Sequence, residues 1–223
     1  MAKIKAVFDA DILIHLIKTN SIEFASETIG DIYLSEYVYK KEINLQTIEG
    51  KKIEKLRNKG IIKILSFNSL TNSQKKVYCD TYRLLKEQDV SDNHDDNPIN
   101  EGERVTASFA KACNIYYYMS DDNRASYHIK SLTSVDIINY CDILFMHLIA
   151  YNKKKEKELR ESYEKFIGLY EKDKVPRILR IGARTCTFKE AMGISFTKFQ
   201  KTKNLSNLLK KIKSNVNSEV ATD

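Results

Sequence analysis

The stretch KIKAVFDADILIHLIK, residues 3–18, decides which fold the first part of the chain is expected to adopt. Residues 3–8 favour a β-strand and end abruptly at Asp9, after which an apolar, helix-like pattern continues to Lys18. A buried strand that passes into a helix through a polar residue is typical of a βαβ unit. The stretch therefore predicts a strand with the Asp9 side chain at its carboxyl end.

The same alternation of strands and helices continues to about residue 150. The later predicted strands are residues 31–34, 61–65 and 115–119; the predicted helices are residues 35–43, 47–58, 71–87, 101–112 and 134–150, and residues 89–100 are predicted to form a polar loop. Strands separated by helices favour a parallel sheet with helices on both faces. Ligands of such sheets bind at the carboxyl ends of the strands, which is where Asp9 and Asp121 lie in this prediction.

The composition indicates an ordered, helix-rich chain that can bury a core. Of the 223 residues, 42% are hydrophobic, and only 7 are Gly and 2 are Pro. No apolar run approaches the roughly 18 residues needed to span a bilayer. Asp9 and Asp11 interrupt the first apolar stretch, which argues against a signal peptide. We therefore expect a cytoplasmic protein with no membrane partner.

The cysteines and histidines do not form a metal-binding pattern. The four cysteines are far apart in the sequence and include no CxxC pair, so they match neither zinc-ligand spacing nor a small disulfide framework. Buried free thiols are the expected state. The four histidines are equally scattered. A metal site in this chain is therefore expected to use carboxylates.

The charge is divided unevenly along the chain. Residues 1–151 carry 19 Lys and Arg against 21 Asp and Glu, a net charge of −2, whereas residues 152–223 carry 18 against 9, a net charge of +9. We predict one domain over residues 1–151 and a basic helical extension over residues 152–223. Apolar side chains at helical spacing in residues 153–172 and 188–212 predict helices that pack on the core or on a partner. The positive charge suits a polyanion, although a solvated lysine-rich helix face has the same composition.

Carboxylates at the ends of buried strands need a cation. Several acids brought together repel one another unless positive charge neutralises them. Because neither thiolates nor imidazoles accompany them, hard cations that prefer oxygen ligands, Mg²⁺ or Mn²⁺, are the expected cofactors. Two such ions roughly 3.5–4 Å apart can activate a water and stabilise the leaving oxygen in phosphodiester cleavage. This chemistry requires three or four converging carboxylates and no nucleophilic side chain.

Four segments resemble PIN domains, in order and spacing, over residues 4–150. They are AVFDADILI (6–14), YLSEYVYKKEI (33–43), GERVTASFAKACNIYYYMSDDNRASYHI (102–129) and SLTSVDIINYCDIL (131–144), and they are most similar to the subgroup with a Gly-Glu helix start and an Asp-Asp strand end. The resemblance implies a three-layer α/β/α fold. It also implies Mg²⁺- or Mn²⁺-dependent cleavage of single-stranded or structured RNA.

The resemblance implies a role for each acid. The catalytic and metal-binding acids would be Asp9, Glu42, Glu103 and Asp121, with Asp122 and Asp11 as further candidate metal ligands. Each acid also has a purely structural interpretation. Asp9 could cap the following helix, and Asp121 with Asp122 could do the same for the next one. Glu42 could be an exposed helix residue, and Asp11 a charge that favours a helix start.

The basic residues are candidates for RNA contacts. Relatives of this subgroup commonly place an Arg several residues after the Asp pair, whereas Arg124 comes early here and is a candidate for positioning a phosphate. Lys153, Lys154 and Lys155 begin the extension, which has no counterpart in a minimal PIN domain, and could contact backbone phosphates. An interface for a protein inhibitor, for an antitoxin or for a second copy of the chain is the other interpretation of the extension.

The expected function is a ribonuclease that acts as a toxin or as a defence effector. Two other functions compete with it. A haloacid-dehalogenase-like phosphatase also begins with strand-Asp-x-Asp, so Asp9 would be the nucleophile and Asp11 the general acid/base. Against it, Ile12 and Leu13 replace the usual Gly, and Glu103 would have no role. A PIN relative that binds RNA or protein without catalysis is the third possibility.

Overall fold

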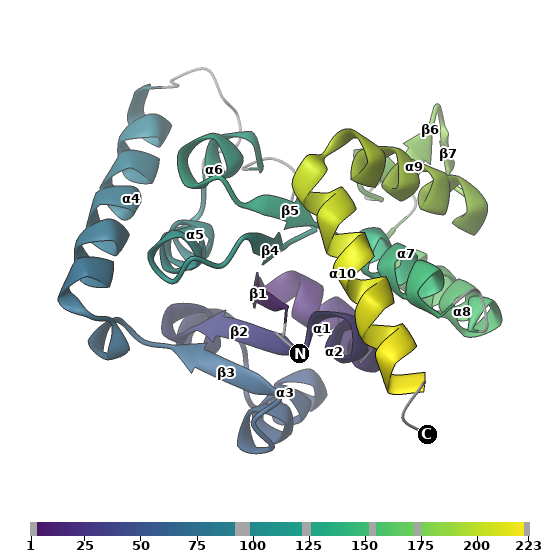
Figure 1. Cartoon of the computed structure of the whole chain (residues 1–223), viewed down its shortest axis with the longest axis horizontal. Coiled ribbons are helices and arrows are strands. Elements are labelled where there is room, and N and C mark those ends of the chain that lie inside the picture. Colours follow the sequence, from purple (N-terminus) through teal and green to yellow (C-terminus); the bar gives the residue numbers. More distant parts are fainter. Residues whose placement is uncertain (1–3, 92–98, 122–125, 152–154, 172–174, 221–223) are drawn as a thin grey trace. The chain divides into compact units, whose positions relative to one another are not determined.

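The computed structural model describes residues 4–91, 99–121, 126–151, 155–171 and 175–220. The chain divides into two compact units that are not continuous in sequence. Figure 1 labels the helices and strands of the chain. The sheet unit comprises residues 2–14 and 29–139, and the helical unit comprises residues 15–28 and 140–223. A domain boundary between residues 151 and 152 stays a prediction.

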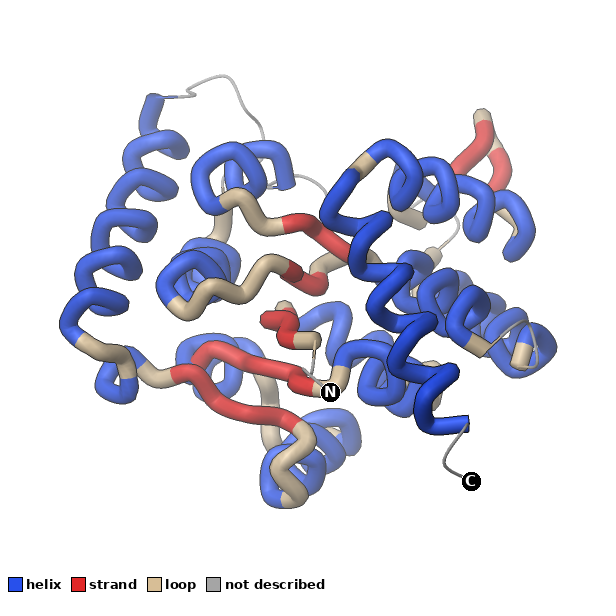
Figure 2. The backbone as a smooth tube through the Cα atoms, viewed as in Figure 1, coloured by secondary structure: helices blue, strands red, loops and turns tan. Residues whose placement is uncertain are grey.

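A five-stranded parallel sheet forms the centre of the sheet unit, and its strands are drawn in red in Figure 2. The strands are β1 (Lys5–Phe8), β2 (Asp31–Ser35), β3 (Ile62–Leu65), β4 (Tyr117–Met119) and β5 (Asp136–Ile138), in the spatial order β3-β2-β1-β4-β5. The order runs outward from β1 in both directions. The topological switch point, at which such sheets bind ligands, therefore lies between β1 and β4.

The central strand is buried on both faces. Ala6, Val7 and Phe8 are all fully inaccessible, although successive side chains of a strand point to opposite faces. Helices therefore cover both sides of the sheet, as expected for an all-parallel sheet. The predicted three-layer α/β/α fold with a parallel sheet is confirmed.

Four complete helices belong to the described part of the sheet unit: α3 (Ile48–Asn58), α4 (Asn72–Ser91), α5 (Glu101–Ala112) and α6 (Ser126–Thr133). Helix α5 contacts β1, β2 and β4, and α4 and α6 pack against α5. The α5 residues Ala107 and Ala110 are fully buried against Val7 and Tyr118. Small side chains let α5 lie close to the sheet, so the first turn of α5 is fixed relative to the strand ends.

The helical unit contains the end of α1 (Ala10–Lys18) and most of α2 (Ile22–Ile29), together with all the elements after residue 140. The later elements are α7 (Tyr140–Ala150), α8 (Glu156–Ile167), the antiparallel pair β6 (Arg180–Ile181) and β7 (Arg184–Thr185), α9 (Phe188–Lys201) and α10 (Lys203–Val220). Helix α7 is buried nearly all round and packs against α8, α9 and α10.

The predicted apolar stripes of the basic extension are confirmed as packed surfaces of the helical unit. The buried members are Leu159, Tyr163, Phe166, Phe188, Met192, Phe199, Leu205, Leu208 and Ile212. Phe196 is an exception among the expected residues, with 48% of its surface exposed. Burial of these stripes leaves lysines of the same helices on the outside.

The predicted helix over residues 134–150 is wrong. Ser134 has a positive φ of 62°, Asp136–Ile138 form β5, and only residues from Tyr140 onward form helix α7. The Asp136 N–H donates to the Tyr116 carbonyl at 2.8 Å, which continues the pairing of β5 with β4. The apolar run at residues 136–138 is too short for its periodicity to distinguish a strand from a helix. It forms a strand because β4 has a free edge with which it can pair. Helix α2 was not predicted.

Two further expectations are corrected in part. All four cysteines are free, but Cys79 is exposed and Cys113 is half-buried, and only Cys141 and Cys186 are buried. Most of the predicted polar loop, residues 92–98, lies outside the described residues, whereas residues up to Ser91 still belong to α4. None of the helices in the described ranges is long and apolar enough to cross a membrane.

Candidate active site

The carboxyl edge of β1 and β4 brings together side chains that are more than a hundred residues apart. Phe8 pairs with Met119, and the Asp9 N–H extends this ladder by donating to the Met119 carbonyl at 2.9 Å. Ser120 follows β4 at the same level, and its N–H donates to the Ile138 carbonyl at 3.0 Å. Asp9 and Asp121 therefore leave neighbouring strands at the switch point.

Asp9 is a buried carboxylate held by two hydrogen bonds. It is 7% exposed; its Oδ1 accepts from the Ala10 N–H at 2.8 Å, and its Oδ2 accepts from the Ser120 hydroxyl at 3.3 Å. Burial raises the pKa of Asp9 to about 8, and the Ala10 hydrogen bond opposes the shift, while the charges of Asp11, Glu103 and Glu42 add to it. The site thus holds more negative charge than its own hydrogen bonds compensate.

Glu42 reaches the site from a π-helical turn, η1 (Val38–Glu42), that follows β2. The residue as a whole is exposed, but its carboxylate rests on Gly102 in the first turn of α5: a Cβ at Gly102 would lie 2.0 Å from Glu42 Oε1. Partial burial there raises the pKa of Glu42, and the charge of Asp11 adds to the effect. Because Gly102 has no side chain, the Glu42 carboxylate can occupy the space next to its Cα.

Glu103 closes a capping box at the start of α5. Asn100 Oδ1 accepts from the Glu103 N–H at 2.8 Å, and Glu103 Oε2 accepts from the Asn100 N–H at 2.8 Å. The side chain is 3% exposed, and its charge contributes to the raised pKa of Asp9. Sequence reasoning missed this structural task, although Asn100 followed three residues later by Glu is a recognisable helix-start pattern.

The remaining predicted acids lie at the same edge or outside the described residues. Asp11 is exposed in the first turn of α1, close enough to raise the pKa of both Asp9 and Glu42. Asp121 is half-buried directly after Ser120. Asp122 falls in residues that the structure does not describe.

The predicted basic contacts are described only in part. Arg124, Lys153 and Lys154 lie outside the described residues. Lys155 belongs to the helical unit, where its Nζ lies 3.3 Å from a Glu27 carboxylate oxygen and over the ring of Tyr151. Its contact with RNA stays a prediction.

The donor set suits a hard cation, but it is not drawn together around one point. Asp9, Asp11, Glu42 and Glu103 offer carboxylate oxygens, the ligands that Mg²⁺ and Mn²⁺ prefer. Their charges act on one another, yet among the described residues no group of three or more His, Cys, Asp or Glu side chains is arranged to hold a metal ion as it stands.

Three other buried acids were not singled out from the sequence. Asp31, at the start of β2, is 7% exposed and lies 2.8 Å from Lys63 Nζ. Asp142 is 1% exposed and pairs with Lys198 within the helical unit. Asp136, at the start of β5, is 2% exposed and lies 3.2 Å from Lys130 Nζ. Each has a cation from its own unit, so none of them resembles the uncompensated carboxylate of Asp9. The pairing of Asp142 with Lys198, 56 residues away in sequence, leaves no local signal.

Comparison of the chain with models of known protein families, with curated proteins and with solved structures gave no match.

The raised pKa of Asp9 predicts how the metal-free protein responds to pH. In the folded chain the pKa of Asp9 is about 8, whereas in the unfolded chain it is near 3.8. Between these pH values the unfolded state has lost the proton that the folded state still binds, so the free energy of unfolding falls as pH rises. Asp9→Asn removes this ionisation. We expect the melting temperature of Asp9→Asn in a chelator to exceed that of the unaltered protein by on the order of 5 °C at pH 8, with little difference at pH 4. A difference that does not grow with pH contradicts the assignment.

Proposed function

We propose that this chain is a metal-dependent nuclease of the PIN type that cleaves phosphodiester bonds in RNA. Mg²⁺ or Mn²⁺ would be held by the carboxylates of Asp9, Glu42, Glu103 and Asp121, with Asp11 and Asp122 as further ligands. The observation that carries the proposal is the raised pKa of Asp9, a buried carboxylate at the switch point with three more acids acting on it.

A bound cation would supply a water of lowered pKa and stabilise the leaving oxygen. The chain's own residues prepare the site for it. The Ser120 hydroxyl and the Ala10 N–H fix both oxygens of Asp9, which limits the rotamers that the carboxylate can adopt. The capping box fixes Glu103, and Gly102 leaves the space in which Glu42 lies. Three acids are thus positioned by Ser120 after β4 and by residues at the starts of α1 and α5.

A phosphatase that uses Asp9 as a nucleophile is supported less well. The Asp11 side chain, the general acid/base of such an enzyme, is exposed in the first turn of α1, and the reaction does not explain why two further acids act on Asp9. That reaction also gives Glu42 and Glu103 no role. The nuclease proposal uses all of these acids.

Removal of single charges should abolish cleavage without unfolding the chain. We expect Asp9→Asn, Glu103→Gln and Asp121→Asn each to lower Mn²⁺-dependent cleavage of an end-labelled single-stranded RNA by at least about 100-fold, since each removes a ligand charge. Gln is itself a capping-box residue, so Glu103→Gln should retain the cap of α5. Asp80→Asn, an exposed acid of α4, is the matched control and should cut normally.

Two results would point away from the nuclease. Loss of p-nitrophenyl phosphate turnover in Asp11→Asn, with RNA left intact by the unaltered protein, would establish the phosphatase. RNA binding without cleavage under Mg²⁺ and Mn²⁺ would establish a binding module.

Gly102→Ala tests the position of Glu42 separately from its charge. The new methyl must displace the Glu42 carboxylate, the far end of a flexible side chain, so the fold should survive while cleavage falls about 10-fold or more. Ala in a helix is favoured over Gly by roughly 0.5–1 kcal/mol, which should keep the melting temperature level or raise it. Gly193→Ala is the control, because no atom lies within 4 Å of its added Cβ. Equal cleavage by both variants would remove Glu42 from the site.

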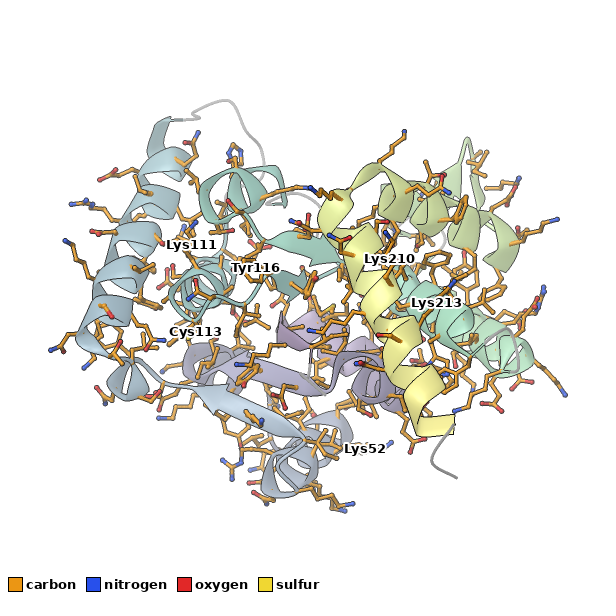
Figure 3. All side chains as sticks on the ribbon, viewed as in Figure 1. Lys52, Lys111, Cys113, Tyr116, Lys210 and Lys213 are labelled. Atoms are coloured by element: carbon orange, nitrogen blue, oxygen red, sulfur yellow. The ribbon has the colours of Figure 1, made fainter. Side chains whose placement is uncertain are left out.

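The lysines left outside on α10 support RNA binding by the helical unit. Lys210 and Lys213 are exposed on this helix, and both are labelled in Figure 3. Deleting the helix would uncover the buried α7, so charge reversal is the cleaner test. We expect Lys210→Glu with Lys213→Glu to weaken RNA binding and to reduce the salt slope of log Kd by roughly 0.7 for each phosphate that the chain no longer neutralises. Lys52→Glu on α3 is the control; an equal effect would indicate a non-specific charge response.

A further inference from the structure

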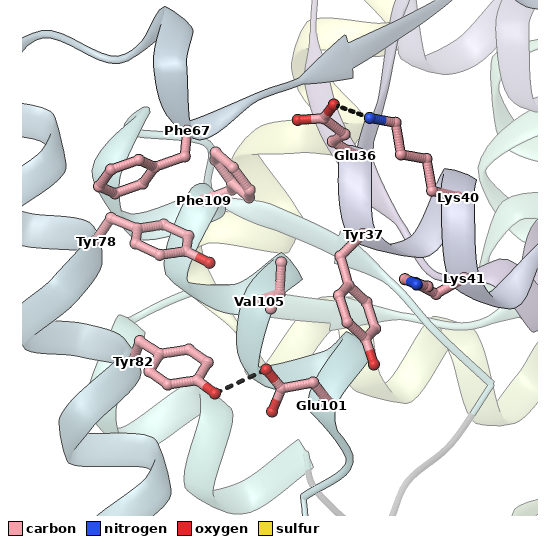
Figure 4. A pocket seen from close by; sticks show the side chains of 10 residues that line it. All are labelled: Glu36, Tyr37, Lys40, Lys41, Phe67, Tyr78, Tyr82, Glu101, Val105 and Phe109. Carbon is pink, nitrogen blue, oxygen red and sulfur yellow. Dashed lines mark hydrogen bonds and ion pairs between the residues drawn. The ribbon is translucent and has the colours of Figure 1, made fainter.

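A pocket of about 440 Å³ lies in the sheet unit, and its lining residues are drawn in Figure 4. They come from η1 and the residues before it, from the 3₁₀ turn η2 (Phe67–Ser69), from α4 and from α5: Glu36, Tyr37, Lys40, Lys41, Phe67, Tyr78, Tyr82, Glu101, Val105 and Phe109. The volume is in the range of small-ligand sites, which run from about 300 to 1,000 Å³.

Aromatic rings make up much of the pocket wall. Tyr78 and Tyr82 lie one turn apart on α4, with their rings nearly parallel at 13° and their centroids 6.3 Å apart. Tyr78 is held by the rings of Phe67 at 5.3 Å and Phe109 at 4.7 Å. Figure 4 places Tyr37 on the opposite side of the pocket from Tyr82. Contacts with three neighbouring rings therefore hold Tyr78 in place at the pocket wall.

The polar groups of the pocket favour an anionic ligand over a cationic one. Glu101 accepts from the Tyr82 hydroxyl at 2.7 Å and forms an ion pair with Arg104 at 3.1 Å. Glu36 forms an ion pair with Lys40 at 2.5 Å. Both lining carboxylates thus already have cationic partners. Lys41 is exposed at the pocket, and the described residues give it no ion pair.

The pocket and the acids are built on the same two segments. Lys41 lines the pocket, and the next residue, Glu42, lies among the acids. Glu101 also lines the pocket, and the Glu42 carboxylate lies against the next residue, Gly102. A ligand in the pocket is therefore close, along both segments, to the acids proposed to hold a cation: Glu42 follows Lys41 directly, and Glu103 comes two residues after Glu101.

We propose that this pocket binds an unstacked base of single-stranded RNA, with the base against the tyrosines of α4 and Lys41 on a neighbouring phosphate. Aromatic side chains bind bases in this way with little sequence preference, because every base has a π-face. A base in a duplex is already stacked, so the pocket selects single-stranded RNA. The inference rests on the proposed function for the nature of the polymer, but it concerns binding and not cleavage.

The test measures binding of the full-length chain in a chelator, so that cleavage plays no part. The probe is a 12-nucleotide single-stranded RNA with one 2-aminopurine, whose fluorescence is quenched by stacking. Tyr78→Leu and Tyr82→Leu keep apolar volume but remove the π-face. We expect each to raise Kd roughly 5- to 100-fold and to abolish the quenching. Tyr116→Leu, a tyrosine that is 59% exposed elsewhere in the sheet unit and labelled in Figure 3, should change neither.

The outcomes separate this proposal from the nuclease proposal. If Tyr78→Leu and Tyr82→Leu remain folded and bind the probe as tightly as the unaltered chain, the pocket does not bind a base. An apolar side chain of a protein partner would then be the ligand that the pocket fits. Equal affinity for the probe and for an abasic strand of the same length also overturns it. Base-dependent binding with no cleavage in Mn²⁺ supports the pocket and removes the nuclease. If Tyr78→Leu and Tyr82→Leu cleave RNA in Mn²⁺ as fast as the unaltered chain, the nuclease proposal is supported and the base-binding pocket is overturned.

Discussion

The pairing of β1 with β4 is the constraint on which the rest of the structure depends. It puts β1 at the centre of an all-parallel sheet, buries every apolar side chain of β1, and reverses the strand order between β1 and β4. At such a reversal the connections leave in opposite directions and open a crevice at the carboxyl ends of the strands. Asp9 ends one strand and Ser120 the other, so a hydrogen bond between them closes a loop of more than a hundred residues.

Electrostatic repulsion at this edge is balanced by hydrogen bonds that also build helices. The carboxylate of Asp9 accepts the first N–H of α1, and that of Glu103 completes the capping box of α5. These bonds hold like charges near one another in the folded chain, where the pKa of Asp9 is raised to about 8. A cation would relieve the repulsion without altering the strand ends. The pocket beside these acids adds aromatic rings and the charge of Lys41, so the two together suit a polymer that carries both phosphates and bases.

Much of this arrangement is readable from local sequence. The alternation of strands and helices predicted the parallel sheet, and the Asp residues after two strands and the Gly-Glu helix start predicted the acids at its edge. The acids Asp9, Glu42 and Glu103 do come close enough for their charges to interact. Local pattern failed where a short apolar run could follow either periodicity: Asp136–Ile138 became a strand because β4 offered unpaired backbone groups. It failed too for Glu103, since the charge expected at a metal or at a helix start also accepts a hydrogen bond from the Asn100 N–H.

The sequence by itself determined the class of fold, the positions of the acids along the chain and the uneven distribution of charge, because each depends on the order and type of neighbouring residues. Only the tertiary structure decided that Glu42 occupies the space left by Gly102, that Ser120 orients Asp9, and that aromatic residues from separate elements enclose a pocket. It also assigned the end of α1, most of α2 and everything from Tyr140 onward to a second compact unit. Contacts between residues tens of positions apart depend on how the helices and strands pack, and no local periodicity records that packing.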